Sequence, residues 1–420
     1  MSQKQKVLFQ LPTSISPDSL NGHNGRVLGM LKYFHDRRDR FSVDAIGGNK
    51  FGLPEWTADL QQEILRFVDN IFIYQGEDNW FDFVYSRAQS VYHQRLLQEQ
   101  LPVDSDYFTP PGYVSFFNNL LARSSYDFVW INNLEYAHLA SNLQSPNLQT
   151  IIDIHDINSI FMLVKKNIDL FKNLKFDHKA NFAREIALLE RFDKVIANSQ
   201  FERDILAKEL PTDKLHLIPF IVSGLDGLDN SSKSTPYEER VFEYDVLFVG
   251  ADNQPNREGI QFFLDEALPL IVERKPDFKV AIAGKISSVV RVEPVLAKNL
   301  VCLGYVPDLA ELYLKSRLVI CPLRTGAGTK FKLVEAMAYA MPIVTTLHSA
   351  SAVSLVDGVN AFITDDPAAY ADRVSRLIHE PDLAARFSVQ ISKTYASQHA
   401  SSAVYSKLDS IFFDANITKI

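Results

Sequence analysis

Apolar runs of strand length alternate with helix-like stretches along this chain, and that alternation constrains the fold more than any other feature. In the first half, the strand-like runs lie at 7–11, 70–74, 128–131, 150–154 and 194–197. Between them come longer stretches in which apolar residues recur with helical spacing, such as 180–191. Strands that alternate with helices in this way predict a parallel sheet with helices on both faces.

The alternation stops at a polar segment and then starts again. Residues 223–236 are rich in Gly, Ser, Asp and Pro, a composition typical of a linker. After it, strand-like runs lie at 245–249, 279–283, 300–304, 318–322 and 343–346, and helical patterns lie at 259–274, 309–315, 330–340, 368–387 and 401–413. Because 420 residues also exceed what one hydrophobic core usually fills, we expect an α/β protein with two Rossmann-like, doubly wound domains facing across a cleft.

These patterns give the expected domain boundaries. The first domain covers residues 1–222, with helical excursions at about 80–125, and the linker covers residues 223–242. The second domain covers residues 243–400, and a helix in 401–420 is expected to pack back on the first domain. Ligands of open parallel sheets bind outside the carboxyl ends of the strands, so the cleft between the domains is the expected site.

Charge and cysteine content exclude several classes of protein. The net charge of −8 argues against a general nucleic-acid binder. The two cysteines, Cys302 and Cys321, encode neither a disulfide framework nor a zinc site. We expect a cytoplasmic protein, peripheral at the inner face of a membrane if it meets one, because no apolar window is long enough to span. The basic run at Arg37, Arg38 and Arg40 fits a solvated helix end, and contact with anionic lipid headgroups stays open.

A glycine loop ahead of a helical pattern is the main candidate for a binding site. The loop follows the strand-like run that ends in Cys321. It combines glycines, which permit close backbone approach, with basic side chains and a capping threonine, at Arg324, Gly326, Gly328, Thr329, Lys330 and Lys332. A helix N-terminus in this setting favours phosphate, and Glu335 shares the helix face of Lys332. A glycine turn with solvent-facing lysines fits the spacing equally well.

Three motifs in order resemble retaining glycosyltransferase family 4 (glycosyl transferases group 1), which has the GT-B fold. They are Leu-Phe-Val-Gly250 with Gln-Pro-Asn-Arg-Glu-Gly-Ile260, Leu-Gly-Tyr-Val-Pro-Asp308, and the run from Gly326 through Glu335-Ala-Met-Ala to Thr346. The similarity covers residues 243–346. The resemblance implies that the loop from Gly326 to Lys330 binds a diphosphate, Glu335 the ribose and the backbone at Val306 the nucleobase, with Arg257 near the phosphates.

Two positions depart from the family pattern. Ala327 stands where the family often has a glutamate that contacts the donor sugar, so the choice of sugar stays open. Ala340 stands where a glycine is usual after the Glu-Ala-Met-Ala segment.

The first domain adds candidates at two strand ends. A glycine loop from Gly22 to Gly25, ahead of a helical pattern, could bring backbone N–H groups to the diphosphate or the sugar, although an ordinary turn explains it too. His155 and Asp156 follow the run at 150–154 and are candidates for contacting an acceptor or donor hydroxyl. Glu135 is a weaker candidate. With Lys330 and Arg257, His155 and Asp156 complete the expected catalytic set.

The resemblance implies a reaction. A sugar moves from a UDP- or GDP-linked donor to a hydroxyl of a glycan, lipid-linked or small-molecule acceptor, with retention at the anomeric carbon and no cofactor. We expect no metal, because the only Asp-x-Asp, Asp104-Ser-Asp106, lies between prolines and not at a strand end. Two alternatives stay open: a sugar-nucleotide-binding subunit without turnover, and a nucleotide-sugar epimerase that uses His155 and Asp156.

Overall fold

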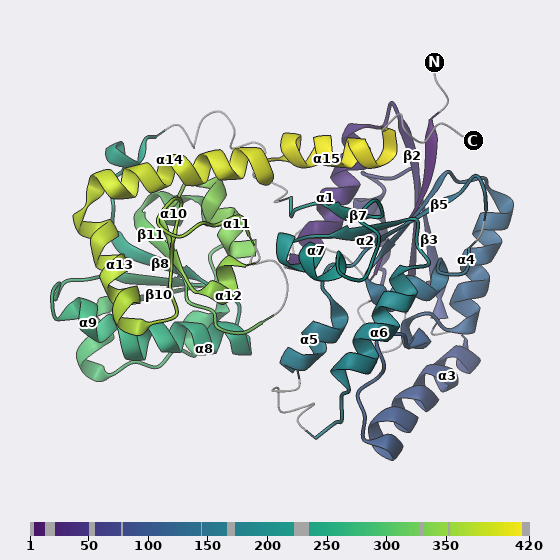
Figure 1. Ribbon diagram of the computed structural model, residues 1–420, viewed down its shortest axis with the longest axis horizontal. Coiled ribbons are helices and arrows are strands. Elements are labelled where there is room, and N and C mark those ends of the chain that lie inside the picture. Colours follow the sequence, from purple (N-terminus) through teal and green to yellow (C-terminus); the bar gives the residue numbers. More distant parts are fainter. Residues whose placement is uncertain are drawn as a thin grey trace. The chain divides into compact units, whose positions relative to one another are not determined.

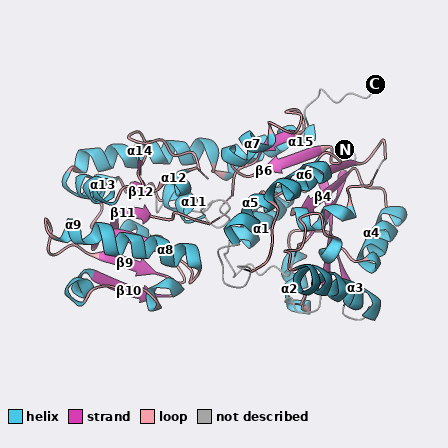
Figure 2. Ribbon diagram, turned by 60° about the horizontal axis from the view of Figure 1, so that its bottom comes forward, coloured by secondary structure: helices cyan, strands magenta, loops and turns pink. Residues whose placement is uncertain are grey.

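The chain folds into two compact units. The computed structural model describes residues 4–12, 22–49, 55–76, 79–143, 145–165, 173–221, 235–326, 331–351 and 353–413. The first unit comprises Met1–Ser223 and Lys407–Ile420, and the second comprises Gly224–Ser406. Each unit is a parallel sheet with helices on both faces (Figures 1 and 2). The first unit is therefore completed by the far end of the chain.

The described part of the first unit contains a seven-stranded sheet in the order β3-β2-β1-β4-β5-β6-β7. Its strands are β1 (Gln5–Gln10), β2 (Phe41–Asn49), β3 (Asn70–Gln75), β4 (Phe128–Asn132), β5 (Gln149–Asp153), β6 (Lys194–Ala197) and β7 (Leu215–Leu217). Neighbouring strands are parallel; Val7 of β1, for example, lies opposite both Val43 and Phe128. The strand order reverses between β1 and β4, the kind of position at which open parallel sheets commonly bind ligands.

Helices of the first unit cover the sheet and extend beyond it. They are α1 (Gly22–Asp36), α2 (Ala58–Ile64), α3 (Trp80–Val91), α4 (Pro111–Arg123), α5 (Asn158–Lys165), α6 (His178–Leu189) and α7 (Gln200–Leu206). A π-helical turn, η2 (Tyr92–Leu97), continues α3, and short 3₁₀ turns lie at η3 (Asp106–Phe108) and η4 (Leu134–Leu139). Side-chain caps fix several helix starts; Ser199, for example, accepts from the backbone N–H of Glu202 at α7.

The last helix, α15 (Ser401–Phe413), ends against the first unit beside α1 and β2 (Figure 1). Phe412 packs edge-on against Phe41 and Phe128, with ring centroids 5.0 and 4.9 Å apart. Arg37 pairs with Asp409 at 2.6 Å, and the Arg40 guanidinium lies 3.3 Å from the centroid of Phe413. Arg37 is therefore held by α15, whereas Arg38 and Arg40 are exposed, as expected of a solvated helix end.

The described part of the second unit contains a six-stranded parallel sheet in the order β10-β9-β8-β11-β12-β13. The strands are β8 (Tyr244–Val249), β9 (Val280–Ala283), β10 (Leu300–Gly304), β11 (Ser316–Cys321), β12 (Ile343–Thr345) and β13 (Phe362–Ile363). The helices are α8 (Gln254–Phe262), α9 (Leu268–Val272), α10 (Ala310–Leu314), α11 (Phe331–Ala338), α12 (Leu347–Ala350), α13 (Pro367–His379) and α14 (Pro381–Gln398). The strand order reverses between β8 and β11.

Two helices expected as single segments are each divided in the structure. The pattern at 259–274 is α8, a π-helical turn η7 (Phe263–Ala267) and α9, in which Pro269 lies at the start. The pattern at 368–387 divides at Glu380 because Pro381 begins α14. Proline lacks a backbone N–H, so it is accommodated in the first turn of a helix and not in its interior.

Candidate functional site

The carboxyl edge of the second sheet, between β8 and β11, brings three segments together. Asn253 caps α8 by accepting from the backbone N–H of Asn256 at 3.0 Å. Gly259 lets α8 touch the loop after β11: a Cβ there would lie 2.7 Å from Leu323 Cδ2 and 2.9 Å from the Pro322 carbonyl oxygen. The start of α8 is therefore held directly against the loop that leads to the glycine motif.

Lys332 of α11 reaches this edge. Its Nζ donates to Asn256 Oδ1 at 2.5 Å and lies 4.5 Å from the centroid of the Phe248 ring in β8. Asn256 is buried, and its Nδ2 donates to the carbonyl oxygen of Ala251 at 2.8 Å. The ammonium group thus stands at the carboxyl end of β8 beside the first turn of α8, where an anion would gain from both.

Glu335 lies on the next turn of α11. Its Oε2 accepts from the Tyr313 hydroxyl at 3.0 Å, and Tyr313, which is fully buried, stacks on Tyr339 with ring centroids 4.7 Å apart. Burial raises the pKa of Glu335 to about 7; the charge of Asp308 adds to the rise, while the hydrogen bond from Tyr313 and the charge of Lys332 oppose it. The carboxyl group is therefore held in position and titrates near neutrality.

The loop after β11 is described as far as Gly326. Arg324 is exposed, with its guanidinium 4.8 Å from the centroid of Phe262, and Thr325 donates to Glu258 at 2.9 Å. Gly326 has φ 105°, a backbone region that favours glycine, and its carbonyl oxygen hydrogen-bonds His348 Nε2 at 2.6 Å. The predicted residues Gly328, Thr329 and Lys330, and the departure Ala327, lie outside the described residues.

Two further predicted residues lie at this end of the sheet. Arg257 is exposed and binds Asp252 through Nε and Nη2, at 2.5 and 2.8 Å. Val306 is half-buried in the segment after β10. The structure therefore groups Lys332 and Glu335 with Asn256 and Tyr313, which the sequence reasoning missed. Asn253 is a residue type that often caps a helix, so the start of α8 near Asn256 could have been predicted from the sequence. No sequence pattern pointed to Tyr313.

Glycine backbone forms the floor of this edge. Gly284, after β9, has φ 96°, and a Cβ there would lie 2.2 Å from the carbonyl oxygen of Gly250, after β8. Its backbone N–H donates to the carbonyl oxygen of Gly304 at the end of β10, at 2.6 Å. Three adjacent strand ends therefore meet backbone to backbone at this edge.

In the first unit, a buried ion pair stands at the carboxyl edge of the sheet. Arg26 of α1 binds Asp153 at the end of β5 through Nε and Nη2, at 2.8 to 2.9 Å, and both side chains are almost fully buried. Arg26 Nη1 also donates to the carbonyl oxygen of Ile218 at 3.0 Å. Burial raises the pKa of Asp153, while Arg26 acts against the rise. The pair ties α1 to the sheet.

His155 and Asp156 follow Asp153 in the same edge. His155 is buried with φ 55°, and its Nε2 lies 3.4 Å from Asn132 Oδ1 and 3.8 Å from Asp153 Oδ2. Asp156 is half-buried near the buried Glu202, whose pKa is raised to about 8 by burial and then by the charge of Asp156. The structure thus collects several titratable groups where the sequence placed only His155 and Asp156.

Gly22 is the first residue of α1 and Gly25 lies in its first turn, so the expected loop from Gly22 to Gly25 is in fact helical. Glu135 lies in η4, half-buried. Among the described residues, no three His, Cys, Asp or Glu side chains are grouped as metal ligands would be.

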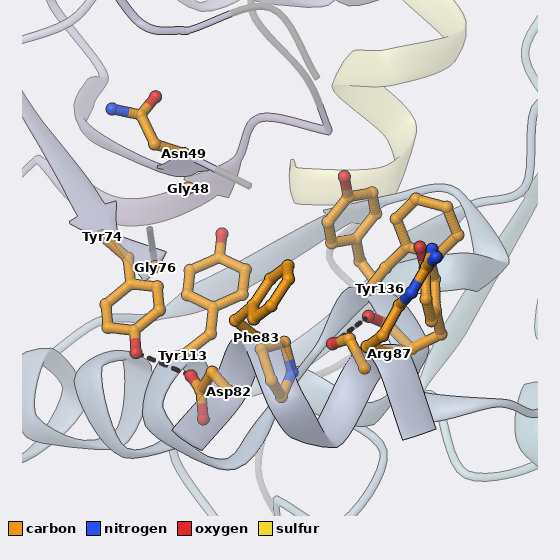
Figure 3. Close-up of a pocket in the computed structure, with 13 residues that line it drawn as sticks. Gly48, Asn49, Tyr74, Gly76, Asp82, Phe83, Arg87, Tyr113 and Tyr136 are labelled. Carbon is orange, nitrogen blue, oxygen red and sulfur yellow. Dashed lines mark hydrogen bonds between the residues drawn. The ribbon is translucent and has the colours of Figure 1, made fainter. Parts of the chain in front are cut away.

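A pocket of about 110 Å³ opens near the ends of β2 and β3 in the first unit (Figure 3). Aromatic side chains make up much of its wall: Tyr74, Phe83, Tyr107, Phe108, Tyr113 and Tyr136. The rings of Tyr74 and Tyr113 stack 5.5 Å apart, and the Tyr74 hydroxyl donates to Asp82 at 2.7 Å. Asn49, Asp82 and Arg87 add polar groups, so the pocket offers flat apolar faces together with hydrogen-bonding groups.

Comparison with known families agrees with this geometry in the second unit. Residues 243–380 match the family model described as glycosyl transferases group 1. The match covers the sheet edge that holds Lys332 and Glu335.

Two curated relatives share part of the chain. An uncharacterized 44.6 kDa protein in the cps region of Klebsiella pneumoniae is 26% identical over 231 residues, 52% of this chain and 54% of that protein. The putative glycosyltransferase EpsD of Bacillus subtilis is 30% identical over 166 residues, 37% of this chain and 43% of that protein. The chain thus spans about half the length of each curated relative.

Solved structures match over the whole chain. A glycosyltransferase from Rickettsia africae has a TM-score of 0.65 at 16% identity and covers 99% of this chain and 100% of its own. Alr3699/HepE of Anabaena, solved in complex with UDP and glucose, has a TM-score of 0.62 at 14% identity, with 98% and 100% covered. With the two parallel sheets, these likenesses establish the GT-B fold that the sequence predicted.

Proposed function

We propose that the protein is a glycosyltransferase that moves a sugar from a nucleotide-diphosphate sugar to an acceptor hydroxyl. The observation that carries the proposal is the sheet edge between β8 and β11, where Lys332 and Glu335 of α11 meet Asn256 and Tyr313. The same residues belong to the segment that matches the glycosyl transferases group 1 model. A cation beside a helix start suits a diphosphate, and a held carboxylate suits ribose hydroxyls.

The donor would lie over the glycine floor of this edge. We assign the segment from Gly326 to Lys330 and Lys332 to the diphosphate, Glu335 to the ribose and the backbone at Val306 to the base, with Arg257 and Arg324 able to turn toward phosphate from exposed positions. UDP or GDP is the expected nucleotide. Support for UDP comes from Alr3699/HepE, which was solved with UDP and glucose.

The reaction we propose retains the anomeric configuration. The bond between the anomeric carbon and the diphosphate oxygen breaks, the acceptor oxygen attacks from the same face, and its proton passes to the departing diphosphate. The protein then acts chiefly by stabilising negative charge as it develops on the diphosphate, through Lys332 and the expected Lys330. We propose that this requires neither metal nor cofactor.

The aromatic pocket of the first unit is our candidate for the acceptor. Sugar rings present flat C–H faces that pack on aromatic side chains and hydroxyls that need polar partners, and the pocket supplies both kinds of group. We propose a glycan, lipid-linked or small-molecule acceptor, and action in the cytoplasm or at the inner face of a membrane.

The main alternative is a sugar-nucleotide-binding subunit without turnover, which we consider because Ala327 stands where the family often has a glutamate. A turnover assay decides between this alternative and the enzyme. The protein is incubated with UDP- and GDP-sugars and a cell glycolipid extract, and free nucleoside diphosphate is measured. Acceptor-dependent release is expected. Stabilisation of the protein by UDP or GDP without release under any condition would favour the binding subunit.

Lys332→Ala tests the assigned site itself. Loss of a phosphate contact of this kind should weaken UDP or GDP binding at least about tenfold, measured as a smaller nucleotide-induced rise in Tm. Lys298→Ala, which removes an exposed lysine elsewhere in the second unit, is the matched control and should bind like the wild type. Equal binding by both variants would place the nucleotide elsewhere.

A further inference from the structure

Helix α3 and the turn η2 expose an unusual amount of apolar surface. Of the large apolar side chains in the described chain that are at least a third exposed, six lie in this one segment of 18 residues: Trp80, Phe81, Phe83, Val84, Tyr92 and Leu96. Trp80 is 74% exposed and Leu96 is 72% exposed. Contiguous exposed apolar surface of this kind marks a site of interaction. We refer to these six side chains as the α3 face.

The polar side of α3, in contrast, faces the protein. Asp82 and Ser86 are buried, and Asp82 accepts from the Tyr74 hydroxyl at 2.7 Å and from the Gly112 backbone N–H at 3.1 Å. Ser86 donates to the carbonyl oxygen of Tyr107 at 3.3 Å. The helix is therefore held by hydrogen bonds through its polar side and turns its apolar side to solvent, the reverse of an ordinary surface helix.

Part of the exposed side follows helical spacing. Trp80, Val84 and Arg87 stand at i, i+4 and i+7, the positions that share one side of a helix, and η2 extends the segment to Leu96. Tyr74 and Asn79 contact each other and Asp82 at the base of the helix, which fixes its orientation. The start of the helix that carries the α3 face is therefore held in place by hydrogen bonds.

The charges beside the α3 face indicate the partner. From Trp80 to Leu97, Asp82 is the sole acidic residue and is buried, whereas Arg87 and Arg95 are exposed. Glu77 and Asp78, just before the helix, lie outside the described residues. Trp and Tyr favour the boundary between lipid headgroups and acyl chains, and arginines there bind lipid phosphate. No described helix is long and apolar enough to cross a bilayer.

We propose that the α3 face docks on an anionic lipid bilayer. The helix lies along the surface, with Trp80, Phe81 and Leu96 in the headgroup boundary and Arg87 and Arg95 on lipid phosphates. A bilayer suits a single convex helix with aromatic side chains and no exposed acidic group, whereas a protein partner would need a matching groove.

Docking of this kind also limits the class of acceptor that we expect. Phe83 and Arg87 belong to α3 and also line the aromatic pocket, so the pocket opens beside the docking surface (Figure 3). If the α3 face lies on the bilayer, the pocket is placed to receive the sugar headgroup of a lipid-linked acceptor. This consequence rests on the proposed function, whereas the docking does not.

Vesicle sedimentation tests the docking without any nucleotide sugar. The full chain is mixed with vesicles of phosphatidylcholine alone or phosphatidylcholine with phosphatidylglycerol, and the bound fraction is measured. Binding to the anionic vesicles is expected. The double variant Trp80→Ser, Leu96→Ser should lower the partition coefficient at least about tenfold. Val295→Ser with Tyr305→Ser, which removes two exposed apolar side chains of the second unit, should leave it unchanged.

Charge and self-association complete the test. Arg95→Gln should weaken binding to anionic vesicles and not to neutral ones, and Arg386→Gln is its exposed control. Absence of vesicle binding by the wild type, or equal binding by the α3 variant and its control, would overturn the proposal. So would a dimer of the wild type that the α3 variant abolishes, because the partner would then be a second copy. Because vesicle binding needs no turnover, its failure is separate from failure of the transferase assay.

Discussion

At the scale of single residues, Glu335 couples the candidate nucleotide site to pH. Burial raises its pKa to about 7 in the folded chain, above the ordinary value of 4.5. A group with a raised folded pKa binds its proton more tightly when folded, so its contribution to stability is complete below about pH 4.5 and is lost as the pH rises through about 7. The free energy of unfolding should therefore fall across this range.

The substitution Glu335→Gln should remove this pH dependence. Between pH 5 and pH 8 the wild type should lose about 1 to 3 kcal/mol more of its unfolding free energy than the variant, as measured by urea denaturation at each pH. Parallel curves for the two proteins would mean that the carboxyl group is ionised over the whole range.

Ala340 adopts a backbone conformation that glycine would suit better. It follows α11 with φ 52°, and the backbone N–H of Met341 donates back to the carbonyl oxygen of Ala336 at 3.0 Å. A left-handed conformation costs a residue with a Cβ about 1 kcal/mol, so Ala340→Gly should stabilise the protein by roughly that amount. Ala336→Gly, inside α11, should destabilise it instead. Chemical denaturation of both variants measures the two signs.

At the scale of elements, the contact between α8 and the loop after β11 depends on Gly259. A methyl group there would meet Leu323 Cδ2 at 2.7 Å and the Pro322 carbonyl oxygen at 2.9 Å. Gly259→Ala should therefore push the two segments apart, lower the unfolding free energy by about 1 to 3 kcal/mol and weaken nucleotide binding. Gly48→Ala, where the nearest atom would be Tyr113 Cζ at 3.6 Å, is the control. A Gly259→Ala protein with wild-type stability and binding would show that the loop position does not matter.

Most of the elements could be predicted because strands of a parallel sheet are buried on both faces and therefore appear as apolar runs. β2 escaped prediction because Asp44, Gly47 and Gly48 interrupt its apolar pattern. The fold explains two of them: Asp44 accepts from the Tyr126 hydroxyl at 2.8 Å, and Gly47 leaves room for Trp56. Both contacts come from outside the strand, so a local pattern could not show them.

The candidate site also contains residues that local patterns predict and residues that only contacts from distant parts of the chain bring in. Lys332 and Glu335 were predictable because three residues on a helix place two side chains on one face. Their partners were not, since Asn256 is 76 residues from Lys332 and Tyr313 is 22 residues from Glu335. Arg257 binding to Asp252 depends on side-chain rotamers, which the sequence does not specify.

At the scale of the whole molecule, the end of the chain is part of the first unit's core. Phe412 is 7% exposed and packs among rings from α1, β2 and β4: Phe34, Phe41, Phe128 and Trp130. The first unit therefore depends on a residue that is synthesised after the second unit. Phe412→Ala should cost about 3 to 5 kcal/mol of stability, because it empties a packed aromatic site.

Hydrogen exchange can assign that loss to one unit. In Phe412→Ala, backbone amides of β1, β2 and β4 should exchange faster, while those of β8, β9 and β11 keep wild-type protection, because the two units have separate cores. Phe387→Ala is the reciprocal control: Phe387 is 2% exposed and packs on Phe362 within the second unit, with centroids 4.9 Å apart. It should speed exchange in the second unit alone. If either variant loosens both units equally, they unfold as one cooperative structure, and the last helix stabilises the whole chain and not only the first unit.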